Sequence, residues 1–148
     1  MAKAFTLQPL LDIMQERSDE ATRRLGQLIA AEQNQKSRLQ LLENYRAEYA
    51  QKMHDAVQAG ISPLVLNNYR DFLGRIDEAI EQQRQAVNKS EHDTRTGQEN
   101  WRQQNRQLKA LDTLAQRHDA RERHAEGKRD QKTQDEFSSR KYSKPEHN

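Results

Sequence analysis

The sequence has no cysteine and little of the residues that build compact folds. Its 148 residues include five glycines, three prolines, three phenylalanines and one tryptophan. Without cysteine the chain forms no disulfide framework and no thiolate metal site, which is typical of a protein kept in a reducing compartment such as the cytoplasm. With so few large apolar side chains, it cannot bury a wide globular core.

Long apolar runs and catalytic motifs are also missing. No stretch approaches the roughly 18 apolar residues of a membrane-spanning helix, and the N-terminus lacks the apolar centre of a signal peptide, so we expect no direct membrane span. The glycines occur singly, so there is no glycine-rich phosphate loop, and the five histidines lack metal-binding spacing such as HExxH. These absences predict that the chain is not an enzyme and needs no cofactor or metal.

What the sequence does contain is an unbroken row of three- and four-residue steps on each side of Gly60. Of the 14 positions in each row, ten before Gly60 and nine after it are apolar, against 32% hydrophobic residues in the whole chain. We call these positions the seam, because such steps place side chains along one face of a helix that packs against another helix. The first row is Leu11, Met14, Ser18, Ala21, Leu25, Leu28, Glu32, Gln35, Leu39, Leu42, Arg46, Tyr49, Met53 and Ala56. The second row is Leu66, Tyr69, Leu73, Ile76, Ile80, Gln83, Val87, Ser90, Thr94, Gly97, Trp101, Gln104, Leu108 and Leu111.

A turn between the two rows is predicted at residues 59–63. Gly60 can take the left-handed conformation that ends a helix, Ser62 can cap the next helix, and Pro63 can open it. Folding the rows about this turn pairs residues whose numbers add to 122, which sets a against d positions as an antiparallel coiled coil requires. The predicted fold is therefore all-α, with a long antiparallel two-helix coiled-coil hairpin over residues 1–137.

The ends of the hairpin are expected to differ. The first helix should begin between Thr6 and Pro9 with Thr6 as its cap, because proline is tolerated in a first turn. The second row continues beyond the reach of the first helix, so residues from about 118 onward are predicted to form an overhanging C-terminal helix. Residues 138–148 contain few apolar side chains and are predicted to be a disordered basic tail. The continuation of the row is Ala115, His118, Glu122 and Ala125.

Charge is spread unevenly along the chain. Residues 101–148 contain 12 Lys and Arg against 8 Asp and Glu, whereas residues 1–100 contain 13 against 15. Acidic residues are interleaved with the basic ones in the C-terminal third, where they would repel nucleic acid phosphates and instead support pairing along a solvated helix. We therefore expect no nucleic acid partner, and an acidic protein surface is the better fit for this region.

One stripe beside the turn is a candidate docking site. Phe72 and Ala79 lie next to the seam, and with Ile76 and Gln83 they run along one side of the second helix. A two-helix seam does not fully cover a large aromatic side chain at a flanking position. The stripe is therefore either a widening of the seam or an anchor for a partner protein.

Five segments point to a known family, and they are Asn68-Tyr69-Arg70-Asp71-Phe72, Glu78-Ala79-Ile80-Glu81-Gln82, Asn100-Trp101-Arg102, Arg129-Asp130-Gln131-Lys132 and Asp135-Glu136-Phe137. They resemble the FliJ family of flagellar export proteins, and the resemblance covers essentially the whole chain. The resemblance implies a coiled coil similar to the central stalk subunit of rotary ATPases, and a place in flagellum biogenesis, motility and chemotaxis. It implies as partners the hexameric flagellar export ATPase, the membrane export gate protein and export chaperones.

The same resemblance implies roles for individual residues. Gate contacts would fall on Phe72, Ile76, Ala79 and Gln83, although Gln83 departs from the histidine of the family at that position. Contacts with the ATPase ring would fall on Arg17, Arg23, Arg24, Arg117, Arg121 and Arg123.

The function implied is that of a non-enzymatic stalk in the type III export apparatus. It would insert into the ATPase ring, promote its activity and couple it to the export gate. It would be cytoplasmic and peripherally associated with the inner membrane at the flagellar base. Two alternatives remain open from the residues: a general export chaperone or escort protein, and the equivalent stalk of a virulence type III secretion system.

Overall fold

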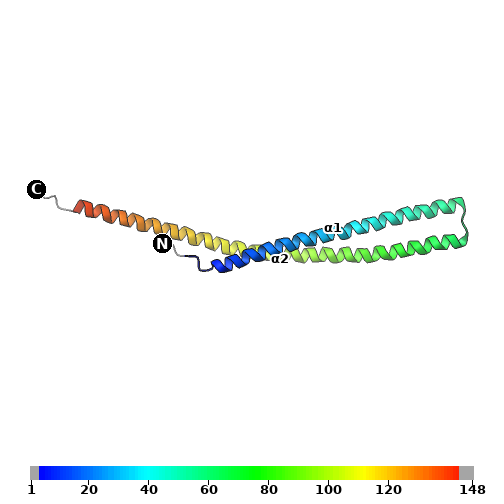
Figure 1. The fold of residues 1–148 in the computed structure, drawn as a ribbon, viewed down its shortest axis with the longest axis horizontal. Coiled ribbons are helices and arrows are strands. Elements are labelled where there is room, and N and C mark those ends of the chain that lie inside the picture. The colour runs from blue at the N-terminus through cyan, green and yellow to red at the C-terminus, as the bar shows by residue number, and fades with distance from the viewer. Residues whose placement is uncertain (1–3, 144–148) are drawn as a thin grey trace. The chain divides into compact units, whose positions relative to one another are not determined.

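The computed structural model describes residues 4–143, which form two helices joined by a turn. Helix α1 spans Gln8–Ala59 and helix α2 spans Pro63–Ser143 (Figure 1). Within the described residues there is no strand, no helix apolar enough to cross a membrane, and no group of three His, Cys, Asp or Glu side chains able to hold a metal. The predicted all-α hairpin is confirmed.

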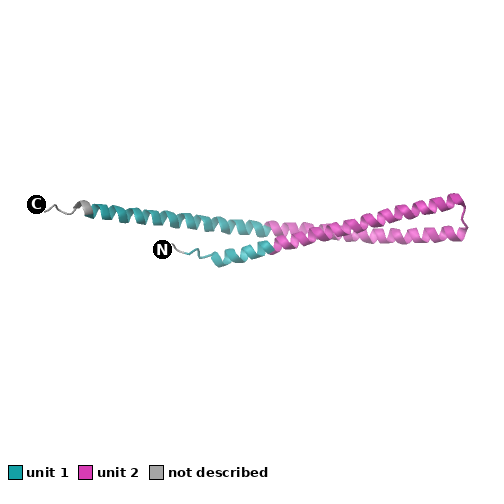
Figure 2. Cartoon of the chain, turned by 45° about the horizontal axis from the view of Figure 1, so that its top comes forward, with its two compact units in different colours: residues 1–19, 103–148 teal, residues 20–102 magenta. Residues whose placement is uncertain are grey.

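Both helices contribute to two compact units, which are described separately (Figure 2). Unit 1 combines Met1–Asp19 with Gln103–Asn148 and so contains both chain ends. Unit 2 is Glu20–Arg102 and contains the turn. Within unit 2 the two helices lie side by side along their length (Figures 1 and 2).

The turn has the chemistry that its residues predict. Gly60 has a φ of 90°, the left-handed region that a residue without Cβ adopts at little cost. Its N–H donates to the carbonyl of Val57 at 3.1 Å. On the other side, Ser62 Oγ accepts a hydrogen bond from the N–H of Val65 at 3.3 Å. Backbone groups that the helix ends would leave unpaired are thereby satisfied.

The start of α1 differs from the prediction in its cap. The helix begins at Gln8, and the Gln8 N–H donates to the backbone carbonyl of Phe5 at 3.0 Å. A backbone turn therefore leads into the helix. The predicted cap at Thr6 is wrong, because the residue directly before the helix is Leu7, whose carbonyl accepts a hydrogen bond from the N–H of Leu11 at 2.9 Å.

All 28 seam positions are buried or half-buried in the structure. The deepest part lies in unit 2, where Leu73, Ile76 and Ile80 are between 4% and 8% exposed. Leu39 and Leu42 of α1 pack against this cluster. Because the seam is only two helices wide, no large side chain among the described residues is completely enclosed.

Contacts between the helices confirm the predicted register in unit 2. Thr94 Oγ1 donates to the carbonyl of Leu28 at 3.3 Å, and these residue numbers add to 122. Trp101 Nε1 donates to Thr22 Oγ1 at 2.9 Å, a pair whose numbers add to 123. In unit 1 the rings of Phe5 and His118 lie 5.5 Å apart, again a sum of 123.

The register makes a direct cross-linking prediction. A chain with Leu42→Cys and Ile80→Cys should form an intramolecular disulfide rapidly, because both side chains meet in the core cluster and the chain has no other cysteine. Mobility on a non-reducing gel measures the reaction. The control pair, Leu42→Cys with Leu73→Cys, is displaced by one heptad and should react slowly. Faster reaction of the control pair would show that the helices are out of this register.

The uncovered part of α2 begins later than predicted. Half-buried side chains continue through His118, Glu122, Ala125 and Glu126, whereas every residue from Gly127 to Arg140 is exposed. The prediction that the overhang starts near residue 118 was wrong. It counted only residues of the first helix as partners, and Phe5, which precedes that helix, packs on the ring of His118.

The predicted disordered tail is also partly wrong. Helix α2 continues to Ser143, so residues 138–143 are helical, while residues 144–148 lie outside the described part. Helix formation here is reasonable because neither glycine nor proline occurs between Gly127 and Pro145.

Candidate interaction surfaces

The predicted gate-binding stripe is divided between the seam and the surface. Ile76 is only 5% exposed and belongs to the core cluster. The Gln83 amide donates to the backbone carbonyl of Gln35 at 3.0 Å and to its side-chain oxygen at 2.7 Å. Phe72 and Ala79 are half-buried at the side of the seam. Of the four residues, these two lie outside the seam positions.

Phe72 is part of a cluster of aromatic side chains from both helices. Its ring lies 4.5 Å from that of Tyr49 and 6.2 Å, nearly perpendicular, from that of Tyr45. Tyr45 is 46% exposed. Sequence reasoning missed Tyr45, although the register shows that it and Phe72 occupy the same heptad position, g, directly before seam residues at position a. We call the side that contains them the g edge.

The opposite side of unit 2 is charged. Lys36 lies 3.8 Å from Glu91, and Arg84 lies 3.7 Å from Glu43. All four residues occupy position e, directly after seam residues at position d. Position e of one helix therefore faces position e of the other, as position g faces position g, which is the arrangement of an antiparallel pair. The hairpin has one ion-paired edge and one aromatic edge.

An arginine within the seam is matched by a carboxylate. Arg46 Nε donates a charge-assisted hydrogen bond to a carboxylate oxygen of Asp77. This hydrogen bond lowers the pKa of Asp77 below its ordinary value and raises that of Arg46. The long arginine side chain covers the seam with its methylene groups while its guanidinium reaches solvent. Arg46 therefore occupies a core position without burying its charge.

The six arginines predicted to bind the ATPase ring are all exposed, and they are divided between the two units. Two of them, Arg23 and Arg24, belong to unit 2. The other four belong to unit 1, where they are Arg17, Arg117, Arg121 and Arg123.

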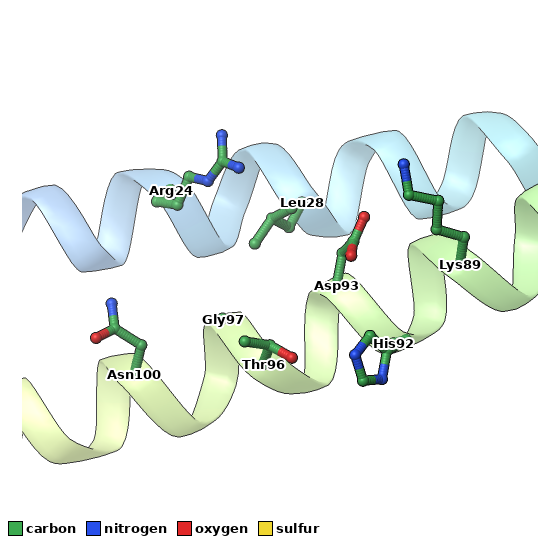
Figure 3. A pocket seen from close by; sticks show the side chains of 8 residues that line it. All are labelled: Arg24, Leu28, Lys89, His92, Asp93, Thr96, Gly97 and Asn100. Carbon is green, nitrogen blue, oxygen red and sulfur yellow. The ribbon is translucent and has the colours of Figure 1, made fainter.

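A groove of about 470 Å³ opens between the helices of unit 2 (Figure 3). It lies beside Gly97, above which Leu28 of α1 is placed so closely that a Cβ on Gly97 would lie 2.5 Å from Leu28 Cδ1. Arg24, Lys89 and Asp93 line it, so charges of both signs are present and no ligand of a single charge is selected. The full lining is Arg24, Leu28, Lys89, His92, Asp93, Thr96, Gly97 and Asn100.

The sequence of the hairpin matches a known protein family over nearly its whole length. The family model described as Flagellar FliJ protein matches residues 3–147. The chain belongs to the FliJ family. Two FliJ relatives, the flagellar FliJ proteins of Escherichia coli K12 and Salmonella typhi, are each 31% identical over 140 residues, which is 95% of both chains.

The fold is also found outside close FliJ relatives. A solved structure of a YscO homologue, CT670 from Chlamydia trachomatis, matches with a TM-score of 0.60 over 95% of each chain. The two sequences are only 12% identical, so this likeness shows the fold alone. The family model and the two relatives confirm the resemblance to the FliJ family that the sequence segments indicated.

Proposed function

We propose that this FliJ family member is a stalk-like component of the flagellar type III protein export apparatus. In this proposal unit 1 inserts into the hexameric export ATPase ring and promotes its activity, and unit 2 contacts the membrane export gate. The protein acts in the cytoplasm, peripherally associated with the inner membrane at the flagellar base. The observation that supports it most is the match to the FliJ family over residues 3–147.

The two units have different exposed surfaces, which supports a different partner for each unit. Unit 1 contains both chain ends and an uncovered helical segment from Gly127 to Arg140. An exposed helix whose seam has no partner is suited to entering a ring of other subunits. Unit 2 contains the aromatic g edge, which is suited to a second partner.

The packing around the stripe changes which residues we assign to the gate contact. We assign the contact to Phe72, Ala79 and Tyr45, which remain accessible on the g edge, while Ile76 and Gln83 hold the two helices in place beneath them. Half-exposed aromatic side chains are frequent anchors of protein interfaces. Export chaperones stay in the proposal as further partners, without an assigned surface.

The export ATPase itself provides the decisive experiment. ATP hydrolysis by the purified ring should rise when the protein is added. Binding of export chaperones without any effect on the ring would favour the escort function instead.

Replacing Phe72 by Ala should weaken binding to the export gate by about 2 kcal/mol, or roughly 30-fold, because an aromatic anchor is lost. Calorimetric titration of the gate's cytoplasmic domain measures the change. Ile29→Ala, an exposed aliphatic site elsewhere in unit 2, is the control and should bind normally. If Phe72→Ala binds as well as the unmodified chain, the g edge of unit 2 is not the gate contact.

A further inference from the structure

The paired part of unit 1 exposes aliphatic side chains outside its covered seam positions. Leu10 is 39% exposed, Ile13 is 46% exposed and Leu114 is 43% exposed. Counted from the seam residues at position a, Leu10 and Leu114 are both at position g, and Ile13 is at position c, one turn further along. Their repeated position indicates a common surface.

These positions belong to the same edge of unit 1. In unit 2 the rings of the g residues Tyr45 and Phe72 meet edge to face across the helices, which shows that g faces g in this unit. The seven-residue repeat runs without interruption into unit 1, and the contact between Phe5 and His118 keeps the same register there. Leu10 of α1 and Leu114 of α2 therefore lie on one edge, within about a turn of each other.

Basic residues continue this edge and carboxylates avoid it. Arg17 and Arg121 are at position g and Arg117 is at position c. Between residues 103 and 131 no Asp or Glu occurs at g or c. The acidic residues of the paired part of unit 1 gather mainly at positions b and e of the opposite edge, and these are Asp12, Asp19, Asp112, Asp119 and Glu126.

We propose that this g edge of unit 1 binds an apolar protein surface bordered by carboxylates. The inference rests on the proposed function, because it places that surface on the export ATPase. The aliphatic centre excludes water, and the arginines at its ends form charge-assisted hydrogen bonds with the carboxylates. The phosphate backbone of a nucleic acid presents no apolar surface on which the aliphatic centre could pack. A bilayer surface is a poorer fit, since the edge lacks the aromatic side chains common in interfacial helices.

Two basic residues on opposite edges of α2 allow a matched test in the full-length protein. Arg121 lies on the g edge, whereas Lys109 is at position b on the opposite edge, and both are exposed. Arg121→Glu should weaken binding to the purified export ATPase about tenfold or more, because a charge-assisted contact becomes a repulsion. Lys109→Glu, with the same change in net charge, should alter binding less than about twofold if only the edge makes contact.

The aliphatic part is tested in the same assay. Leu114→Ser should weaken binding about tenfold, whereas Ile29→Ser, at a site of similar exposure in unit 2, should not. Circular dichroism melts of all four variants confirm that each is folded. Added salt should reduce the difference between Arg121→Glu and the unmodified chain more than it reduces that of Leu114→Ser.

The outcomes separate this inference from the function on which it rests. If the unmodified chain binds the ATPase but Arg121→Glu and Lys109→Glu lose affinity equally, the edge assignment is overturned and the stalk proposal stands. If the unmodified chain does not bind the ATPase, both are overturned. Binding to phosphatidylglycerol vesicles that Arg121→Glu abolishes, with ATPase binding unchanged, would identify a lipid surface and overturn the protein partner.

Discussion

Ending the chain after Glu126 is expected to abolish stimulation of the export ATPase and to leave thermal stability nearly unchanged. This truncation removes residues 127–140, whose side chains are all exposed. The seam positions in this stretch are polar, so no apolar packing is lost, and changes at such surface sites usually stay within about 0.5 kcal/mol. Steady-state ATP hydrolysis and a circular dichroism melt measure the two quantities.

A longer truncation provides the control. Ending the chain after Gln116 also removes the half-buried residues His118, Glu122 and Ala125, including the ring contact with Phe5. This chain should therefore lose stability as well as stimulation. Full stimulation by the chain that ends at Glu126 would show that the exposed segment does not enter the ring.

Replacing Ile80 by Ala is expected to lower the free energy of unfolding by about 2–4 kcal/mol. Ile80 is 4% exposed and belongs to the deepest part of the seam, where Leu39 and Leu42 pack against it. A thin seam has few neighbouring side chains that could fill the space. Urea denaturation followed by circular dichroism gives the change.

The matched control is Ile29→Ala, which makes the same chemical change at a side chain that is 42% exposed. It should cost less than about 1 kcal/mol, because little apolar area returns to water. Equal losses for the two variants would mean that the core cluster does not hold the hairpin together.

The fold was predictable because one local rule governs nearly the whole chain. A seam residue every three or four positions needs no knowledge of distant parts of the sequence, and all 28 predicted seam positions are covered. The turn was predictable because Gly60 and Ser62 each have a specific backbone role. The register followed from folding the two rows about that turn.

The surfaces were less predictable, because they depend on contacts across the helices. The predicted stripe included Ile76 and Gln83, which the seam itself uses, and it omitted Tyr45, which only the register brings to Phe72. The start of the overhang was misplaced because Phe5 lies outside the helix yet covers His118. Charge counting along the sequence did not separate Arg121 from Arg123, although position in the repeat does.

The amide pair inside the seam has a mechanical consequence for unit 2. If α2 slid along α1 by one heptad, Gln83 would lose Gln35 and face Leu28 or Leu42 instead. A half-buried amide without a partner costs about 1–3 kcal/mol, and the ion pairs of the e edge would be broken together with it. We therefore expect the helices of this unit to resist sliding past one another, so that unit 2 responds to a load as one stiff rod and not as two separate helices.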